Sequence, residues 1–165
     1  MKKIIVIGCP GSGKSHFSRE LNKITDIDLY HLDMMYWNAD KTTVDRPIFL
    51  QRLTDALNKD AWIIDGNYTS TMELRMSMCD TVFFLDLPVE VCLEGVSQRR
   101  GRSRPDMPWI EVEEDTEFTD FIKKFDEREA PLARALIEKY KDTKKIIIFK
   151  SREEADRFLL DLKNK

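Results

Sequence analysis

The chain has 165 residues, of which 42% are hydrophobic and 35% charged, and its formal net charge at pH 7 is −3. This length predicts one domain, residues 1–165, with its own hydrophobic core, and the composition excludes collagen-like, low-complexity and disordered proteins. The net negative charge gives no general attraction to nucleic acid, and no apolar run approaches the roughly 20 residues that a membrane-spanning helix needs.

The first third of the chain alternates apolar runs with helical patterns. Residues 3–7 form a β-branched run typical of a buried parallel strand, and residues 14–24 place apolar side chains at helical spacing. A weaker strand is expected at 28–32, followed by an irregular segment, 33–43. A proline then opens a helix expected to end near residue 58.

Two further apolar runs, residues 62–65 and 81–86, predict buried strands. Pro88 opens a helix that ends near Arg100, and we expect the proline-containing segment 101–110 to be a loop.

The last third returns to helical periodicity at 118–125, and Pro131 is expected to kink or interrupt that helix before 132–140. Residues 145–149 predict a fifth strand, and Ser151 caps a last helix. Strands that alternate with helices predict an α/β fold, a parallel sheet covered by helices on both faces. Such a sheet binds ligands at the carboxyl ends of its strands.

A phosphate-binding motif joins the first predicted strand to the first predicted helix. Its residues match G-x-x-x-x-G-K-[ST] in full: Gly8, Cys9, Pro10, Gly11, Ser12, Gly13, Lys14 and Ser15. Backbone N–H groups and the helix dipole cradle a polyphosphate in such a loop. We expect the loop and the adjacent His16 to bind ATP, with Lys14 at the β and γ phosphates and Ser15 on Mg²⁺. The motif alone does not separate kinases from GTPases or ATPases.

Two carboxylates follow predicted strands at the same edge of the sheet. Asp65 stands where P-loop enzymes place the carboxylate that faces the metal, and the alternative is an ordinary turn residue before Gly66. Asp33 either orients an acceptor hydroxyl, or acts as its general base, or caps a turn. His31 is either a packed imidazole or a substrate contact.

Arginines gather after the fourth strand and its helix, at Arg99, Arg100, Arg102 and Arg104. One interpretation is a short lid, approximately residues 99–115, that excludes water while Arg99 or Arg100 stabilises the transferring phosphoryl group. The other is a solvated basic loop. The acidic run 111–117 is most simply a solvated helix start, and residues 34–37 (Met-Met-Tyr-Trp) form either an acceptor pocket or a flap over the core.

Two segments resemble the P-loop nucleoside monophosphate kinase family, adenylate kinases in particular. They are residues 62–68 (WIIDGNY) and residues 80–88 (DTVFFLDLP), the second followed by Arg99 and Arg100. The resemblance implies a three-layer P-loop NTPase fold with a five-stranded parallel sheet and a short lid, with ATP, Mg²⁺ and a small phosphate acceptor as ligands. It also implies that Lys150 lies near the adenine.

One arginine of the adenylate kinases has no counterpart in this chain. Those enzymes follow Asp-Gly with Phe-Pro-Arg, whereas this chain has Asn67-Tyr68-Thr69. If residues 69–78 are helical, Arg75 is the candidate to replace the missing side chain.

A narrower resemblance is to bacterial topology modulation proteins. It rests on His31-Leu32-Asp33 followed by Tyr36-Trp37, on residues 65–68, and on residues 149–151. Two functions therefore stay open: a Mg-ATP-dependent kinase acting on a nucleotide or another small molecule, or an ATP-binding regulator of DNA topology with little transferase activity. The net negative charge and the lack of a DNA-reading motif favour the kinase.

The cysteines and the N-terminus bear on the cellular compartment. Three cysteines without a C-x-x-C pair argue against a disulfide framework and a cysteine zinc site, and residues 4–7 are too short for a signal-peptide core. We expect reduced thiols and a cytoplasmic protein.

Overall fold

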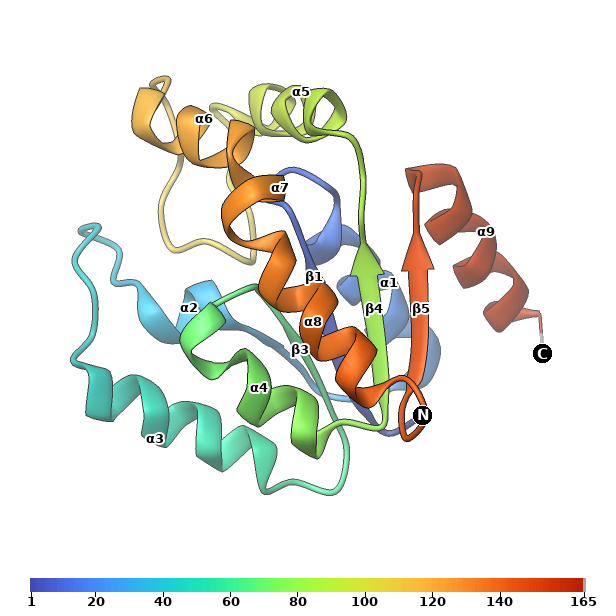
Figure 1. The fold of residues 1–165 in the computed structure, drawn as a ribbon. Coiled ribbons are helices and arrows are strands. Elements are labelled where there is room, and N and C mark those ends of the chain that lie inside the picture. The colour runs from blue at the N-terminus through green and yellow to red at the C-terminus, as the bar shows by residue number, and fades with distance from the viewer. Residues whose placement is uncertain (165) are drawn as a thin grey trace.

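A five-stranded parallel sheet forms the centre of the computed structural model, which describes residues 1–164 (Figure 1). Its strands are β1 (Lys3–Gly8), β2 (Leu29–His31), β3 (Trp62–Asp65), β4 (Thr81–Leu85) and β5 (Lys145–Phe149), in the spatial order β2-β3-β1-β4-β5. The phosphate motif therefore leaves the sheet from its central strand. The predicted α/β fold with a five-stranded parallel sheet is confirmed.

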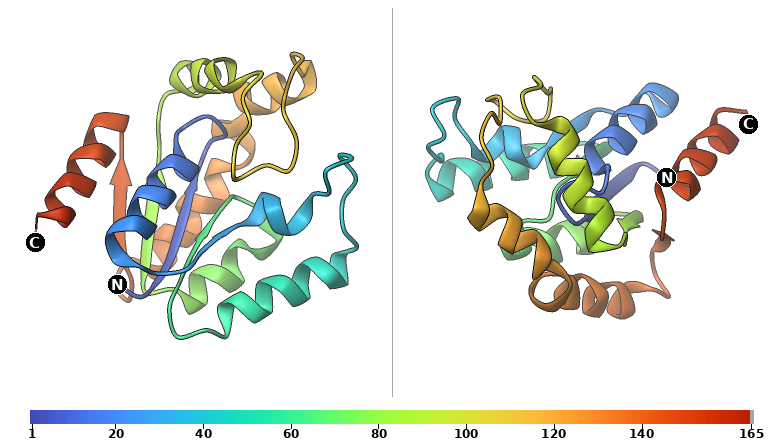
Figure 2. Two further views of the ribbon diagram at one scale, coloured as in Figure 1. Left: turned by 180° about the vertical axis from the view of Figure 1, so that it is seen from behind. Right: turned by 90° about the horizontal axis from the view of Figure 1, so that it is seen from above.

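Helices cover both faces of the sheet (Figures 1 and 2). In chain order they are α1 (Lys14–Thr25), α2 (Leu32–Tyr36), α3 (Arg46–Leu57), α4 (Thr69–Met78), α5 (Val89–Arg99), α6 (Thr116–Lys123), α7 (Phe125–Arg128), α8 (Ala130–Tyr140) and α9 (Arg152–Lys163). Helices α1 and α9 pack on one face of the sheet, whereas α3, α4 and α8 pack on the other. Each helix among residues 1–164 is too short or too polar to cross a membrane.

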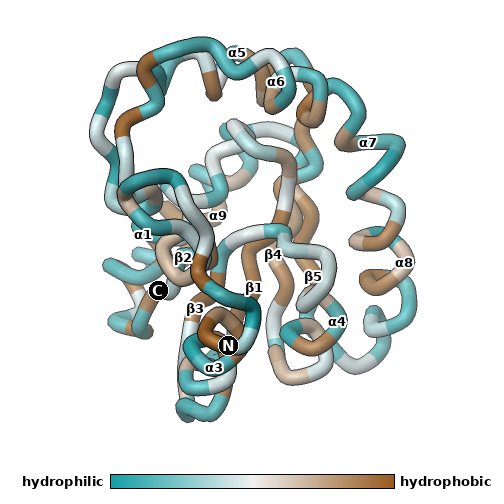
Figure 3. Tube along the Cα trace, turned by 90° about the vertical axis from the view of Figure 1, so that its left-hand side faces the viewer, coloured by the Kyte–Doolittle hydropathy of each residue, from teal (hydrophilic) through white to brown (hydrophobic). Residues whose placement is uncertain are grey.

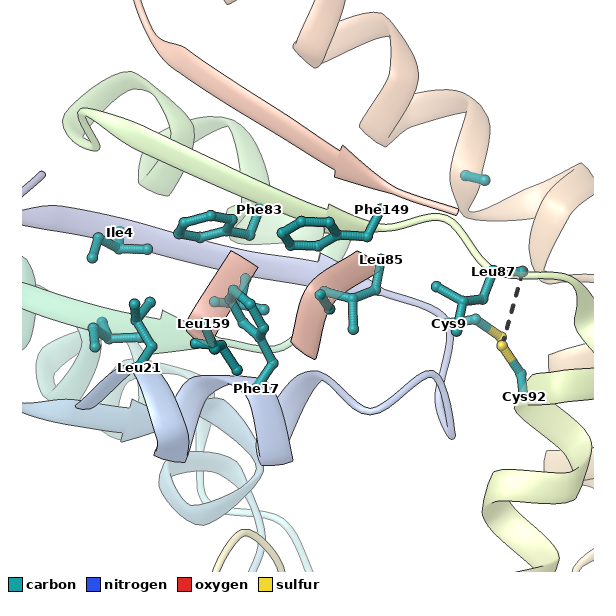
Figure 4. Close-up of a cluster of buried hydrophobic side chains, with 14 of the residues drawn as sticks. Ile4, Cys9, Phe17, Leu21, Phe83, Leu85, Leu87, Cys92, Phe149 and Leu159 are labelled. Atoms are coloured by element: carbon teal, nitrogen blue, oxygen red, sulfur yellow. Dashed lines mark hydrogen bonds between the residues drawn. The ribbon is translucent and has the colours of Figure 1, made fainter. Parts of the chain in front are cut away.

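The strands read as continuous apolar runs because both of their faces are buried. In β1, Ile4 and Val6 enter the core beneath α1 and α9, whereas Ile5 and Ile7 enter the core beneath α3, α4 and α8. Figure 3 shows this contrast between hydrophobic strands and the largely hydrophilic outer helices. On the α1 side, Phe17 meets Phe83 edge-to-face with ring centroids 4.9 Å apart (Figure 4). Such aromatic pairs add to the free energy of burial itself.

Three segments differ from the sequence prediction. Residues 33–43 are not irregular throughout, because Leu32 is fully buried and begins the short helix α2, after which Trp37 and Thr43 form an antiparallel bridge. The second strand is only three residues long. Pro131 was expected to interrupt the helix that begins near residue 118, but that helix already breaks at Lys124. Pro131 instead lies in the first turn of α8, where its missing N–H costs nothing.

Close backbone contact joins the phosphate loop to α5, which passes over the carboxyl end of β1 (Figure 2). A Cβ placed on Gly95 of α5 would lie 2.2 Å from the carbonyl oxygen of Gly11, and one on Gly11 would lie 2.0 Å from that of Cys92. Beside this contact the sulfur atoms of Cys9 and Cys92 face each other (Figure 4), and the chain's three cysteines are free and buried. Glycine is therefore required on both sides of the contact.

We predict that Gly95→Ala lowers the free energy of unfolding by about 2 kcal/mol, because the clash outweighs the higher helix propensity of alanine. Urea unfolding of the purified variant measures the change. Ser97→Ala, on the exposed side of the same helix, is the matched control and should change stability by less than about 0.5 kcal/mol. A Gly95→Ala protein as stable as the wild type would show that the loop and α5 separate readily.

Candidate active site

A cleft of about 1540 Å³ opens at the carboxyl ends of β1, β2 and β3. Among the residues singled out from the sequence, it brings together Pro10, Lys14, Ser15, Asp33, Asp65, Arg99 and Arg100. Its other walls are α2, the start of α3, the segment from residue 100 to residue 115, and α6. Figure 1 shows this 100–115 segment descending from α5 toward α2. Parallel sheets bind ligands at this edge.

The phosphate loop curls because Gly8, Gly11 and Gly13 all have positive φ. The Lys14 ammonium donates to the carbonyl oxygen of Cys9 at 3.0 Å, which turns its charge back over the loop. Burial lowers the pKa of Lys14, and the negative charge of Asp65 opposes that shift. Helix α1 begins at Lys14, so its unpaired N–H groups and positive dipole end face the same space.

Two side chains that the sequence prediction did not single out for this purpose fix the loop. The Asn67 amide, which lines the cleft, accepts from the Gly8 N–H at 3.0 Å and donates to the Gly8 carbonyl at 2.6 Å. Arg152, at the start of α9, donates to the carbonyl oxygens of Gly11 at 2.8 Å and Val91 at 3.1 Å. The loop is thus held at its first residue and at its middle by residues far away in the sequence.

Asp65 is a buried carboxylate with one free oxygen. Its Oδ1 lies 2.9 Å from His31 Nδ1, whereas its Oδ2 has no hydrogen-bond partner among the described residues. Burial opposes the charging of His31, but the bond to Asp65 raises its pKa overall. Asp65 and Ser15 line the same cleft. A carboxylate oxygen without a partner and a serine hydroxyl are the kind of oxygen ligands that Mg²⁺ takes from protein when phosphates supply the others. The residues therefore fit a magnesium ion.

Asp33 lies in the first turn of α2 and lines the cleft. Its Oδ1 accepts a hydrogen bond from the Tyr68 hydroxyl at 2.7 Å. Burial raises the pKa of Asp33, and the bond from Tyr68 partly opposes that shift. Asp33 thus lies at a helix start and lines the cleft, and its role toward an acceptor stays a prediction.

The arginines between residues 99 and 104 are not a solvated basic loop. Arg99 donates twice to Glu111, at 3.0 and 3.2 Å, and Arg104 lies 3.3 Å from the same carboxylate. Glu111 is therefore part of an ion-pair network, and the expectation of a merely solvated acidic run is wrong for it. Helix α6 begins only at Thr116, capped by the Asp115 carboxylate. Arg100 lines the cleft, whereas Arg102 is exposed.

Asp106 is a site residue that sequence reasoning missed. It is 4% exposed and pairs with Arg104 at 3.1 Å and Arg19 at 3.4 Å. Burial opposes its ionisation, but neighbouring positive charges, that of Arg104 foremost, hold its pKa below the usual range. In the sequence, the opposite charges of Arg104 and Asp106, two residues apart, were the signal for an ion pair here. Through Asp106 and Arg19 the 100–115 segment is tied to α1, the helix that follows the phosphate loop.

Arg75 does not take the place of the missing arginine. Residues 69–78 are helical, as the substitution required, but Arg75 is fully buried and donates to the carbonyl oxygens of Gly66 at 3.0 Å, Tyr68 at 3.2 Å and Asn67. Burial lowers its pKa to about 10, so it stays charged at neutral pH. Its guanidinium shapes the turn after β3 and is not available to an acceptor.

Of the predicted cofactor contacts, Pro10, Lys14 and Ser15 line the cleft. The other residues of the phosphate loop (Gly8, Cys9, Gly11, Ser12 and Gly13) and two residues outside the loop do not line it. His16 is exposed on α1, and Lys150 is exposed and paired with Asp86. Contact of either with ATP stays a prediction.

Comparison with solved structures identifies the fold. Shikimate kinase from Aquifex aeolicus is 22% identical with a TM-score of 0.56, covering 98% of this chain and 96% of its own. Shikimate kinase from Bacteroides thetaiotaomicron is 18% identical with a TM-score of 0.62, covering 98% and 96%. Shikimate kinase from Acinetobacter baumannii, in complex with shikimate, is 18% identical with a TM-score of 0.63, covering 100% and 95%. The chain thus has the P-loop kinase fold of these enzymes.

No protein-family model and no curated protein sequence matches the chain. The three solved structures give no support to the narrower resemblance to topology modulation proteins.

We predict that Arg75→Met lowers the free energy of unfolding by about 3 kcal/mol, because the substitution leaves three partly buried carbonyl groups without their hydrogen-bond donor. Thermal or urea unfolding measures it. Glu73→Met on the exposed face of the same helix is the control, with an expected change below about 0.5 kcal/mol. Equal losses in the two variants would mean that the turn after β3 holds its shape without Arg75.

Proposed function

We propose that this protein is a Mg-ATP-dependent kinase that transfers the γ-phosphoryl group of ATP to a small-molecule acceptor. The observation that carries the proposal is one shared cleft, in which Lys14 and Ser15 of the phosphate loop lie with Asp33 and Asp65. A cradle for polyphosphate and a carboxylate for an acceptor hydroxyl are the two parts that a phosphoryl transferase needs. The shikimate kinase fold supports the proposal independently.

The donor half of the cleft binds ATP. The N–H groups of the loop and of the first turn of α1 hold the phosphates, and Lys14 leaves the Cys9 carbonyl to meet the β and γ phosphates. Ser15 and the free Oδ2 of Asp65 would hold Mg²⁺. When bound, the ion neutralises charge on the phosphate oxygens. His31 holds Asp65 in the orientation that leaves Oδ2 free.

The acceptor half is organised around Asp33. The acceptor hydroxyl oxygen forms a bond to the γ-phosphorus, while the bond from that phosphorus to the β–γ bridging oxygen breaks and ADP leaves with the electron pair. Asp33 accepts the proton of the hydroxyl. Tyr68 holds one oxygen of Asp33 and so aims the other at the cleft.

The 100–115 segment acts as the lid. Arg100 lines the cleft and makes no ion pair within residues 1–164, so it is free to reach the transferring group. Arg99, the last residue of α5, donates to Glu111 and so joins the start of the lid to its far end. Closure excludes water, which would otherwise compete with the acceptor.

The alternative of a DNA-topology regulator is not pursued, because no observation in the structure or the comparisons favours it. The three similar structures are all of kinases.

We predict that Lys14→Ala and Asp65→Asn each lower kcat for phosphoryl transfer by about 100-fold or more, with the fold retained. The measurement is a transfer screen with Mg-ATP against nucleosides, nucleoside monophosphates and hydroxylated metabolites. Lys23→Ala, exposed on the same helix as Lys14, is the control and should behave as wild type. Binding of Mg-ATP without transfer to any acceptor would refute the proposed function.

A second prediction concerns the pH profile. Asp33 works as a base only when ionised, and Tyr68→Phe removes the hydrogen bond that lowers its pKa. The acid limb of kcat/KM should therefore move to higher pH. Tyr30→Phe, whose hydroxyl bonds Asp28 instead, should leave the limb in place. An unmoved limb in Tyr68→Phe would assign the base role elsewhere.

A further inference from the structure

Five aromatic side chains line the cleft and touch one another in a continuous wall. Tyr36 is the hub, with ring centroids 5.1 Å from Tyr68, 5.2 Å from Trp37 and 5.4 Å from Phe49. Trp37 continues the wall to Trp109 of the 100–115 segment at 5.3 Å. All five belong to the lining of the cleft. We call this set the aromatic wall.

The aromatic wall begins at the carboxylate that receives the proton. Tyr68 donates to Asp33 at 2.7 Å and packs against Tyr36 in the next position of the wall. When an acceptor hydroxyl bonds to Asp33, we therefore expect the rest of the acceptor molecule to lie against Tyr36 and Trp37. The wall, and not the phosphate loop, meets the body of the acceptor.

The wall is fixed in place before any ligand arrives. The N–H of Val44 donates to the Tyr36 carbonyl at 2.9 Å, and the N–H of Asn38 donates to the Thr42 carbonyl at 2.8 Å. These bonds fold residues 36–44 back on themselves, around the bridge between Trp37 and Thr43. Tyr36 and Trp37 keep part of their surface exposed while lining the cleft, which favours the acceptor-pocket interpretation of residues 34–37 over a flap that only covers the core.

The charges around the wall disfavour an anionic acceptor. At its inner end Asp33 faces the carboxylates of Asp65 and Asp106. The cations there already have partners: Lys14 bonds the phosphate loop, and Arg19 and Arg104 pair with Asp106. Two arginines that would serve an anion are engaged elsewhere: Arg99 with Glu111, and Arg75 with backbone carbonyls.

The outer rim of the cleft also carries more acidic than basic side chains. It carries the cations Lys41, Arg46 and Arg100, of which the first two are exposed to solvent. Against them stand five carboxylates of the lid and α6 side: Glu113, Glu114, Asp115, Glu117 and Glu129. Exposed cations bind a single anion weakly, because solvent and salt screen them. An ionised phosphate or carboxylate thus gains little here and is repelled at the inner end.

We infer that the acceptor is an uncharged hydroxylated compound with a flat ring, of the nucleoside class. Because the rings of Trp37 and Trp109 stand at 86° to each other, a ring that stacks on Trp37 meets Trp109 edge to face. The inference rests on the proposed function and names the substrate class of the same site. Stacking of a base on an aromatic side chain is worth about 1–3 kcal/mol, which corresponds to roughly ten- to hundredfold in affinity.

The test is calorimetric binding to the full chain with Mg²⁺ and a non-hydrolysable ATP analogue present. The probes are adenosine, guanosine, cytidine and uridine, each paired with its own 5′-monophosphate, and shikimate as a carboxylate. We expect at least one nucleoside to bind about tenfold tighter than its monophosphate. Trp37→Leu should weaken that binding by about tenfold, and Trp109→Leu gives a second, independent variant should the first fail to fold.

Arg46→Gln is the matched control for charge, since Arg46 lines the same cleft but is exposed. It should change nucleoside affinity by less than about twofold. Tighter binding of a monophosphate or of shikimate, lost in Arg46→Gln, would overturn the inference, and so would the absence of binding by every nucleoside.

The two proposals fail separately. Transfer to a monophosphate or to shikimate alone would leave the kinase standing and remove the nucleoside class. Nucleoside binding that depends on Trp37, with no phosphoryl transfer to any acceptor, would remove the kinase and retain the ligand class.

Discussion

Backbone contact between the phosphate loop and α5 is the constraint on which the site depends. Gly11 and Gly95 allow the two chains to approach so closely that no side-chain carbon fits on either residue. The contact sets where α5 begins its course over the sheet, and therefore where Arg99 and Arg100 emerge at its end. Arg152 reinforces it by binding a carbonyl on each side, from Gly11 and Val91. Loop, helix and lid are thus one mechanical unit.

Electrostatics organise the rest of the cleft. Asp33, Asp65 and Asp106 come from three separate segments and lie around Lys14 and Ser15. So many carboxylates in a partly desolvated space are costly unless each is paired. His31, Tyr68 and Arg104 supply the pairs. Among residues 1–164, the buried oxygen Oδ2 of Asp65 has no hydrogen-bond partner, which is the basis for assigning it to Mg²⁺ in the proposed kinase.

The fold and several residues of the cleft were predictable from the sequence, because the patterns that indicate them lie within short segments of the chain. The phosphate motif is contiguous and lies between elements with clear periodicity, so Lys14 and Ser15 required no knowledge of distant contacts. Strands buried on both faces show themselves as unbroken apolar runs, which is why all five strands were located. Asp33 and Asp65 followed from the rule that parallel strands end at one edge.

The parts that escaped prediction depend on long-range pairing. Arg75 has the spacing of a ligand-binding arginine, yet three carbonyls of the turn before it occupy its guanidinium. Asp106 lies in a loop without periodicity, and its burial arises only when Arg19 and Arg104 converge on it. Glu111 is likewise fixed by side chains elsewhere in the lid, those of Arg99 and Arg104. No window of neighbouring residues contains the information that fixes these side chains.

The order of the strands divides the site into a rigid half and a yielding half. The phosphate loop leaves β1, which has a hydrogen-bonded strand on each side and should exchange its amide protons slowly. Asp33 follows β2, a three-residue strand at the edge of the sheet with a single neighbour, which should exchange sooner. In the proposed kinase, nucleotide binding at the first half is thereby insulated from changes around an acceptor at the second. A lineage built on this fold can exchange one acceptor for another through β2, α2 and residues 36–44 without disturbing its hold on the donor.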